Sequence, residues 1–202
     1  MHDPSLLPAF AATAGTRLLF WVSFGAWGAI ELSLWARDRR AVAGVREDRG
    51  SGFAITVAIT AAMVCAFSAP PNFPRLRIAA SPELLVGVGA ALVWLGIAFR
   101  LWAVRTLGRY FRVTVTTQDD HRLIDTGPYR RFANPSYTGA LVTLAGIGVG
   151  IGNCVSLAAL VLLPVAGFAV RIRVEEASLG RRFGEAFARY RADRWVLIPF
   201  LW

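Results

Sequence analysis

The sequence YTGALVTLAGIGVGIGNCVSLAALVLLPVAGFAV, residues 137–170, decides the fold, because two apolar segments in it are separated by Gly152-Asn153. The segments, 137–151 and 155–170, are slightly shorter than the about 20 apolar residues that a helix needs to cross a bilayer, and flanking residues can lengthen them. Gly-Asn is typical of a tight turn. The stretch therefore predicts a helical hairpin that crosses a membrane and returns.

Three further apolar segments precede this hairpin, at residues 18–35, 53–69 and 84–104. The chain of 202 residues is 55% hydrophobic, with a mean hydropathy of +0.50, which is too apolar for an ordinary soluble domain. We predict an all-α integral membrane protein with five transmembrane helices in a single domain, 1–202. Residues 1–104 hold three N-terminal spans, and residues 105–202 hold a polar connector, the hairpin and a C-terminal tail.

The basic residues are distributed unevenly between the predicted loops. All 22 of them are arginine, and the net charge is +9. Only Arg17, Arg75 and Arg77 lie on one side, and the other arginines follow the first, third and fifth apolar segments. The positive-inside rule predicts an N-terminus outside, with the arginine-rich loops and the C-terminus in the cytoplasm. The basic excess is assigned to orientation among membrane lipids, and no nucleic acid is predicted as a partner.

Cysteine and histidine are too scarce for a metal site or a disulfide framework. Cys65 and Cys154 lie in or beside apolar segments, and the only histidines are His2 and His121. No metal is therefore predicted. The N-terminal residues lack a basic region ahead of the first apolar segment, so that segment is predicted to be a retained span.

Some residues within the apolar segments carry expectations of their own. GIGVGIG, residues 146–152, has no strand before it, so it predicts close helix packing through small residues rather than a dinucleotide-binding loop. Glu31 is expected to face a partner or the cytoplasmic edge of its span. Arg100 is expected to extend its side chain to that same edge.

The connector between the third span and the hairpin is polar and rich in turn residues. Residues 111–117, FRVTVTT, alternate like a short strand, and Gly127-Pro128 predicts a turn. Asn134-Pro135 begins the fourth span, since proline is tolerated in the first turn of a helix. The free N–H groups of that helix N-terminus would suit a polar ligand.

The tail predicts an amphipathic helix. Leu179, Phe183, Phe187 and Tyr190 recur at helical spacing between charged residues, a pattern typical of a helix on the protein or the membrane surface. The terminal residues WVLIPFLW are expected to dock at the membrane interface, where tryptophan is favoured.

Two acidic residues, Glu175 and Glu176, follow the last span directly. Arg171 and Glu175 are four residues apart and share one helix face. An acidic residue in this position needs water, an arginine or a cationic ligand. From the residues alone, Arg171 and Glu175 form either a structural salt bridge or part of a site.

These features belong to two stretches, HRLIDTGPYRRFANPSYTGAL at 121–141 and RIRVEEASLGRRFGEAFARY at 171–190. Their order and spacing resemble the isoprenylcysteine carboxyl methyltransferase family and its relatives among the membrane phospholipid methyltransferases. The resemblance covers about half of the chain, from Leu107 to the C-terminus, together with the general plan of spans. It implies that S-adenosyl-L-methionine binds in a pocket between the cytoplasmic connector and the C-terminal amphipathic helix.

The matched motifs also imply roles for individual residues. Arg171 corresponds to a basic residue on the acceptor side and is the expected catalytic residue. The residues expected to bind the cofactor are His121, Arg122, Leu123, Ile124, Tyr129, Asn134, Pro135, Ser136, Tyr137 and Glu175. The chain departs from the family at Ala133-Asn134, where the family usually has Arg-His. Asparagine can form hydrogen bonds but carries no charge and moves no proton.

The function that the resemblance implies is carboxyl O-methylation of a lipophilic, isoprenylcysteine-like acceptor. A carboxylate acceptor needs no general base, so the protein has mainly to align donor and acceptor. The expected partners are a lipophilic small molecule or prenylated substrate, and membrane lipids. The alternatives are methylation of a phospholipid or another small molecule, a nicotinamide-dependent enzyme similar to sterol reductases, and a membrane scaffold without catalysis.

Overall fold

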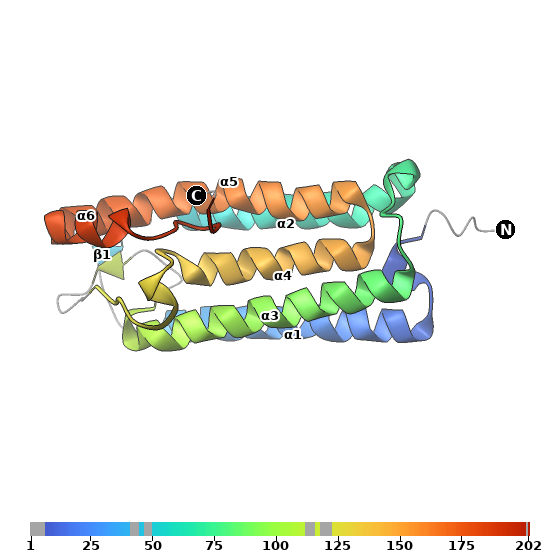
Figure 1. Ribbon diagram of the computed structural model, residues 1–202, viewed down its shortest axis with the longest axis horizontal. Helices are drawn as coiled ribbons and strands as arrows, with labels where there is room; N and C mark the ends of the chain where they lie inside the picture. Colours follow the sequence, from blue (N-terminus) through green and yellow to red (C-terminus); the bar gives the residue numbers. More distant parts are fainter. Residues whose placement is uncertain (1–6, 41–44, 47–49, 112–115, 118–122, 201) are drawn as a thin grey trace.

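The computed structural model describes residues 7–40, 45–46, 50–111, 116–117, 123–200 and 202. Its long helices lie lengthwise beside one another and alternate in direction, so that the ends of α1, α3 and α5 meet the starts of α2 and α4 (Figure 1). The helices are α1 (Ala14–Arg40), α2 (Ser51–Asn72), α3 (Pro82–Leu107), α4 (Pro135–Ile151), α5 (Cys154–Phe183) and the short α6 (Glu185–Ala192).

Short elements connect these helices. A two-residue strand β1 (Val45–Arg46) pairs antiparallel with β2 (Thr116–Thr117) at the end of the bundle that carries α6. The strand predicted at 111–117 is thus observed only at its last two residues, and 112–115 lie outside the described ranges. The remaining elements are the 3-10 helices η2 (Ala9–Ala11), η3 (Pro74–Leu76), η4 (Gly108–Tyr110) and η5 (Gly127–Arg130).

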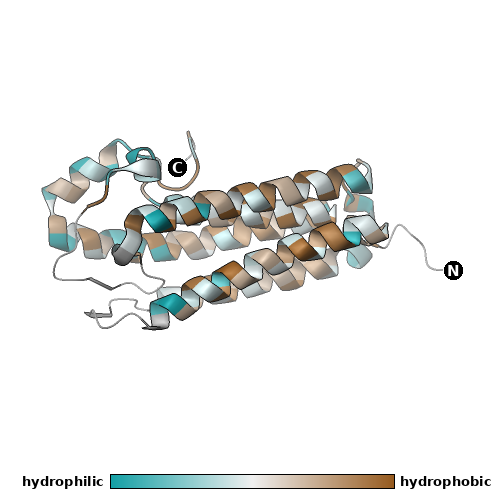
Figure 2. Cartoon of the chain, turned by 90° about the horizontal axis from the view of Figure 1, so that it is seen from below, coloured by the Kyte–Doolittle hydropathy of each residue, from teal (hydrophilic) through white to brown (hydrophobic). Residues whose placement is uncertain are grey.

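The prediction of an all-α integral membrane protein is confirmed. Four helices, α1, α2, α3 and α5, are long and apolar enough to cross a membrane. Many of their large apolar side chains face outward, including Leu18 and Phe53, and apolar residues dominate the middle of the bundle (Figure 2). The predicted fourth span, α4, is shorter, because its 17 residues extend only about 25 Å.

Helix α4 lies between α3 and α5 and is largely buried. Glycines let it approach α3 closely: a Cβ placed on Gly89 would lie 2.6 Å from the carbonyl oxygen of Gly146. A Cβ on Gly96 would lie equally close to the carbonyl oxygen of Gly139. The prediction that GIGVGIG mediates close helix packing is therefore confirmed. We call the four residues Gly89, Gly96, Gly139 and Gly146 the glycine seam.

The hairpin turn between α4 and α5 forms where the sequence predicts it. Gly152 has a φ of +80°, a conformation that glycine adopts without strain. The Asn153 side chain then caps α5 by accepting a hydrogen bond from the Val155 N–H at 2.9 Å. Its Nδ2 donates to the Phe73 carbonyl at 2.9 Å, which ties this turn to the end of α2.

The tail differs from the prediction in one way. The predicted amphipathic helix is broken at Gly184, whose φ of +51° ends α5 and starts α6 in a new direction. In the terminal segment, Val196 and Leu197 are buried against Ala140 and Phe168, whereas Phe200 and Trp202 are exposed, and docking at a membrane interface stays a prediction. A hydropathy pattern marks these residues as apolar but does not say what covers them.

Candidate functional site

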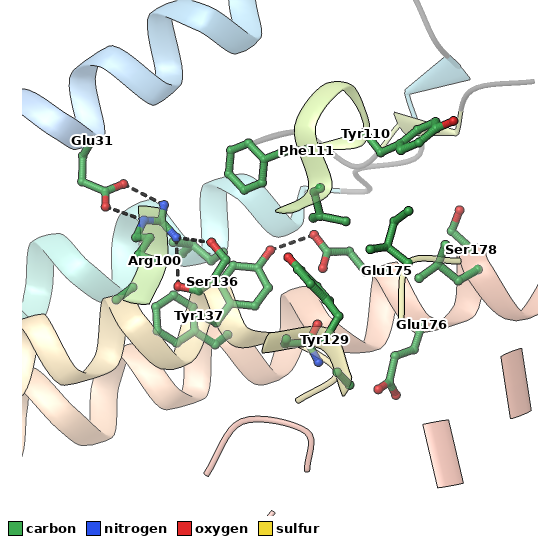
Figure 3. Close-up of a pocket in the computed structure, with 18 of the residues that line it drawn as sticks. Glu31, Arg100, Tyr110, Phe111, Tyr129, Ser136, Tyr137, Glu175, Glu176 and Ser178 are labelled. Carbon is green, nitrogen blue, oxygen red and sulfur yellow. Dashed lines mark hydrogen bonds and ion pairs between the residues drawn. The ribbon is translucent and has the colours of Figure 1, made fainter. Parts of the chain in front are cut away.

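A cavity of about 480 Å³ opens at the end of the bundle that holds α6 and η5 (Figure 3). Its wall includes side chains from all five long helices, from α6 and from the segments around η4 and η5. Successive long helices run in opposite directions, so the ends of α1, α3 and α5 and the starts of α2 and α4 converge at this position (Figure 1). The wall has an acidic and aromatic region, a cationic position and an apolar arm.

The acidic and aromatic region is formed by Glu175, Glu176, Tyr129, Tyr137 and Tyr190. Tyr137 donates a hydrogen bond from its hydroxyl to Glu175 Oε1 at 2.7 Å (Figure 3). Glu176 pairs with the Nε of Arg191 at 2.6 Å. Carboxylates beside aromatic faces form an environment that favours a cationic ligand.

Burial keeps the phenols outside the membrane-spanning helices in their neutral form. It raises the pKa of Tyr190 to about 12, and the nearby Asp125 carboxylate adds to the increase while Arg194 opposes it. Burial likewise raises the pKa of Tyr129 well above its usual value. At neutral pH both tyrosines therefore present uncharged rings and hydroxyls to the cavity.

Arg171 lies behind this region and outside the cavity wall. It is fully buried, and its Nε donates to Glu175 Oε1 at 2.8 Å and contacts the Tyr137 hydroxyl at 3.3 Å. Its Nη1 donates to Ser51 Oγ at 3.0 Å, which links α5 to the start of α2. The guanidinium thus holds the two side chains that face the cavity, and these separate it from the cavity interior.

The cationic position in the wall is Arg100 on α3. Its Nε lies 2.6 Å from Glu31 Oε1 and its Nη2 donates to Oε2 at 2.8 Å, so the two groups meet at two points (Figure 3). Its Nη1 donates to Ser136 Oγ at 2.6 Å and to the Ser136 carbonyl at 3.1 Å. Arg100 thus lies beside Glu31 at the cavity end of the bundle, and its position at the membrane edge stays a prediction. The expectation that Glu31 faces a partner is confirmed.

The apolar arm lies between α1 and α2. Helix α1 contributes Trp27, and α2 contributes Ile55 and Ile59. Because α1 packs on α3 and α2 packs on α5, the two helices stand apart at this end (Figure 1). They meet further along, where Trp21 stacks on Phe67 with ring centroids 6.1 Å apart. The arm is therefore closed by aromatic contacts at its far end.

The start of α4 is joined to the C-terminal segment. Asn134 lines the cavity, but its Nδ2 donates to the Val196 carbonyl at 3.1 Å. The Ala133 N–H donates to the Trp195 carbonyl at 2.7 Å, and Thr138 Oγ1 donates to the Leu197 carbonyl at 2.7 Å. Arg194 supports this junction by donating from Nε to the Tyr129 carbonyl at 2.7 Å. The Ala133-Asn134 departure therefore lies at a docking point for the C-terminal segment.

The structure brings together most of the residues that the sequence predicts for the site. Those that line the cavity are Leu123, Ile124, Tyr129, Asn134, Ser136, Tyr137 and Glu175. Pro135 is buried in the first turn of α4 and Arg171 is shielded, so neither belongs to the wall. His121 and Arg122 lie outside the described residues.

Several wall residues are not predicted from the sequence. Glu31 and Arg100 lie within apolar spans, and their opposite signs are the available signal for a pair. Trp27, Ile55 and Ile59 carry no signal, because apolar side chains in a span look alike whether they face lipid or a cavity.

A multi-pass membrane protein with this cavity at one end falls into a known class. Residues 84–186 match the family model described as "Phospholipid methyltransferase". The chain belongs to this family, and the resemblance to it and to the isoprenylcysteine methyltransferases is confirmed.

The curated relatives that match are protein-S-isoprenylcysteine O-methyltransferases. A probable one from Oryza sativa subsp. indica is 34% identical over 116 residues, which are 56% of this chain and 61% of that protein. The one from Saccharomyces cerevisiae is 34% identical over 134 residues, 64% of this chain and 56% of that protein. The matches thus span about three fifths of the length of these relatives.

A solved structure shares the fold. It is the eukaryotic intramembrane Ras methyltransferase, an isoprenylcysteine carboxyl methyltransferase, and its TM-score to this chain is 0.60 at 29% sequence identity. The likeness covers 72% of this chain and 52% of that one. The arrangement of the spans is therefore that of a known membrane-enzyme fold.

Proposed function

We propose that the protein is an S-adenosyl-L-methionine-dependent methyltransferase that methylates the carboxylate of a lipophilic, isoprenylcysteine-like acceptor. The observation that supports this most directly is one cavity that joins an acidic, aromatic region to an apolar arm between α1 and α2. The first region suits a cationic donor and the second a lipid chain. The names of the relatives support the same acceptor class.

The residues present fit the donor. S-adenosyl-L-methionine carries a positive sulfonium and an ammonium group, and when bound it supplies an activated methyl group. Glu175 is the carboxylate proposed to face the ammonium, and the rings of Tyr129 and Tyr137 offer negative faces to positive charge. Leu123, Ile124, Asn134 and Ser136 complete the proposed binding wall, and His121, Arg122 and Pro135 retain their proposed roles from the resemblance.

Arg171 is proposed to act through Glu175 and Tyr137. Its contacts at 2.8 and 3.3 Å hold these two side chains against the cavity. We therefore assign Arg171 as a positioning residue of the reaction.

The acceptor is proposed to enter with its lipid chain between α1 and α2. Trp27, Ile55 and Ile59 would hold the lipid chain, and the bound donor would supply the methyl group that the acceptor carboxylate takes up. The products are a methyl ester and a neutral thioether, and no proton is transferred. Alignment of the two reactants is the main contribution of the protein. We further propose that the cavity end faces the cytoplasm, since most arginines lie there.

Binding and transfer assays on the purified protein in detergent would test this function. We expect calorimetric binding of S-adenosylmethionine, and transfer of its labelled methyl group to an N-acetylated S-prenylcysteine. Glu175→Gln should weaken cofactor binding by about tenfold, because it removes a charged partner. Glu185→Gln is the matched control, since the Glu185 side chain is 94% exposed.

Three results would contradict the proposal. Absence of cofactor binding at millimolar concentration would exclude the reaction. Preference for a nicotinamide cofactor would favour the reductase alternative. Transfer to phosphatidylethanolamine vesicles but not to the prenylcysteine would assign the site to phospholipid methylation.

A further inference from the structure

Arg100 is the only cationic side chain among the described residues that line the cavity. Arg171, which the motifs place on the acceptor side, is fully buried behind Glu175 and Tyr137. A carboxylate that enters the apolar arm therefore encounters Arg100 in the wall. The arm itself begins at Trp27 on α1, one helical turn from Glu31, the partner of Arg100.

We propose that Arg100 is the residue that binds the carboxylate of the acceptor, and that Glu31 occupies it until the acceptor enters. This inference rests on the proposed function. The acceptor class follows from the chemistry: a lipophilic molecule with a free carboxylate at the end that lies nearest the donor. A neutral ester or amide of the same molecule lacks the group that Arg100 recognises.

The geometry of the existing ion pair supports this assignment. Glu31 meets the guanidinium through both carboxylate oxygens, at 2.6 and 2.8 Å. The Nη2–Oε2 contact is a charge-assisted hydrogen bond, and the Nε–Oε1 contact is a close ion pair. Arg100 thus already holds a carboxylate in the orientation that an acceptor would need.

The two partners differ in how firmly they are held. The Arg100 side chain is 12% exposed and is also bound to Ser136 through Nη1, whereas the Glu31 side chain is 31% exposed. Glu31 is therefore the partner that can leave. Exchange of one carboxylate for another keeps the guanidinium paired throughout, which avoids the cost of an unpaired buried charge.

Arg100 is also connected to the donor region. It binds Ser136, and the next residue, Tyr137, donates its hydroxyl to Glu175. Adjacent residues of the first turn of α4 thus contact the proposed acceptor anchor and the proposed donor carboxylate (Figure 3). Such an arrangement would place the acceptor carboxylate and the donor on one rigid helix start.

Equilibrium binding of two matched probes would test the proposal. The probes are an N-acetylated S-prenylcysteine acid and its carboxamide, measured on the full chain in detergent. We expect the wild type to prefer the acid. Arg100→Gln should weaken binding of the acid by about tenfold and leave the carboxamide nearly unchanged. Arg105→Gln, at an exposed position of the same helix, is the control that should keep the preference.

Glu31→Gln provides a second variant whose expected effect has the opposite sign. Removal of the competing carboxylate should tighten binding of the acid several-fold, because the free form of Arg100 becomes more populated. A purely structural ion pair predicts the reverse, weaker binding of both probes. Arg100→Lys should retain part of the preference, since charge remains but the two-point contact is lost. If Arg100→Gln fails to fold, binding of the acid and the carboxamide to Glu31→Gln and Arg100→Lys still tests the proposed role of Arg100.

The outcomes separate this proposal from the proposed function. If the wild type transfers methyl groups to the acid but Arg100→Gln keeps the preference for it, the role of Arg100 is overturned and the function stands. Weaker acid binding in Glu31→Gln would overturn the exchange of carboxylates. If the wild type binds neither S-adenosylmethionine nor the acid, both fail.

Discussion

The glycine seam and the cavity end are held together by different forces. Along the seam, α3 and α4 approach until their backbones touch, with no polar side chain needed at Gly89 and Gly146. At the cavity end, α1 and α2 stand apart, and ion pairs and hydrogen bonds hold the helix ends. Close packing specifies a single arrangement, whereas polar contacts leave an interior space and can exchange partners. Function is expected where packing gives way to polar contacts.

The largest expected effect comes from Arg171→Gln, at the base of the cavity end. It leaves Glu175 without its cation and Ser51 without its donor, so stability should fall by about 3 kcal/mol and cofactor binding should be lost. Thermal unfolding and calorimetry in detergent measure both. Arg189→Gln is the control, because its pair with Glu185 is 3.6 Å long and exposed. If Arg171→Gln unfolds at the same temperature as the wild type, the polar contacts of Arg171 do not stabilise the cavity end.

Gly89→Ala tests the other side of the comparison. The new Cβ would lie 2.6 Å from the Gly146 carbonyl oxygen, so the helices must separate at a cost of about 1–3 kcal/mol. Gly87→Ala on the same helix meets nothing within 4 Å and should be neutral or slightly stabilising. The thermal unfolding temperatures of Gly89→Ala and Gly87→Ala in detergent measure this difference in stability. Cofactor affinity should change little in either variant, and a large loss in Gly89→Ala alone would mean that the seam and the cavity are coupled.

Asn134→Ala should affect the cavity end more mildly. It removes the hydrogen bond to the Val196 carbonyl, worth about 1 kcal/mol, and loosens the segment that packs on Ala140 and Phe168. Cofactor affinity should fall several-fold, and limited proteolysis should cleave the C-terminal segment sooner. Asn72→Ala, exposed at the other end of the bundle, should change neither measurement. Unaltered proteolysis of Asn134→Ala would argue against the docking role.

The smallest effect concerns pH. Burial raises the pKa of Tyr190 in the folded protein to about 12, from about 10 when unfolded. The folded state therefore retains the proton longer, so this contribution to stability is complete below pH 10 and is lost as the pH rises toward 12. Between pH 10 and 12, the unfolding temperature of the wild type should therefore fall relative to that of Tyr190→Phe. A constant difference would show that the phenol is solvated.

The sequence by itself determined the helices, the hairpin turn at Gly152-Asn153, the packing role of GIGVGIG and the family. Each follows from hydropathy, turn chemistry or a linear motif, which are local properties of the chain. It also predicted seven residues that line the cavity, because they belong to contiguous motifs. The break of the tail helix at Gly184 escaped prediction, since the hydrophobic pattern continues across the glycine.

Only the tertiary structure decided which charges face the cavity. Arg171 and Arg100 both occur at the edge of an apolar span, yet one is shielded by Glu175 and Tyr137 and the other lines the wall beside Glu31. Glu31 and Arg100 are 69 residues apart in the chain, and Asn134 meets Val196 across 62. The direction in which a side chain points depends on which helices pack beside its own. That choice is made by contacts such as the glycine seam, which reaches the backbone of Arg100: a Cβ on Gly139 would lie 2.7 Å from the Arg100 backbone nitrogen.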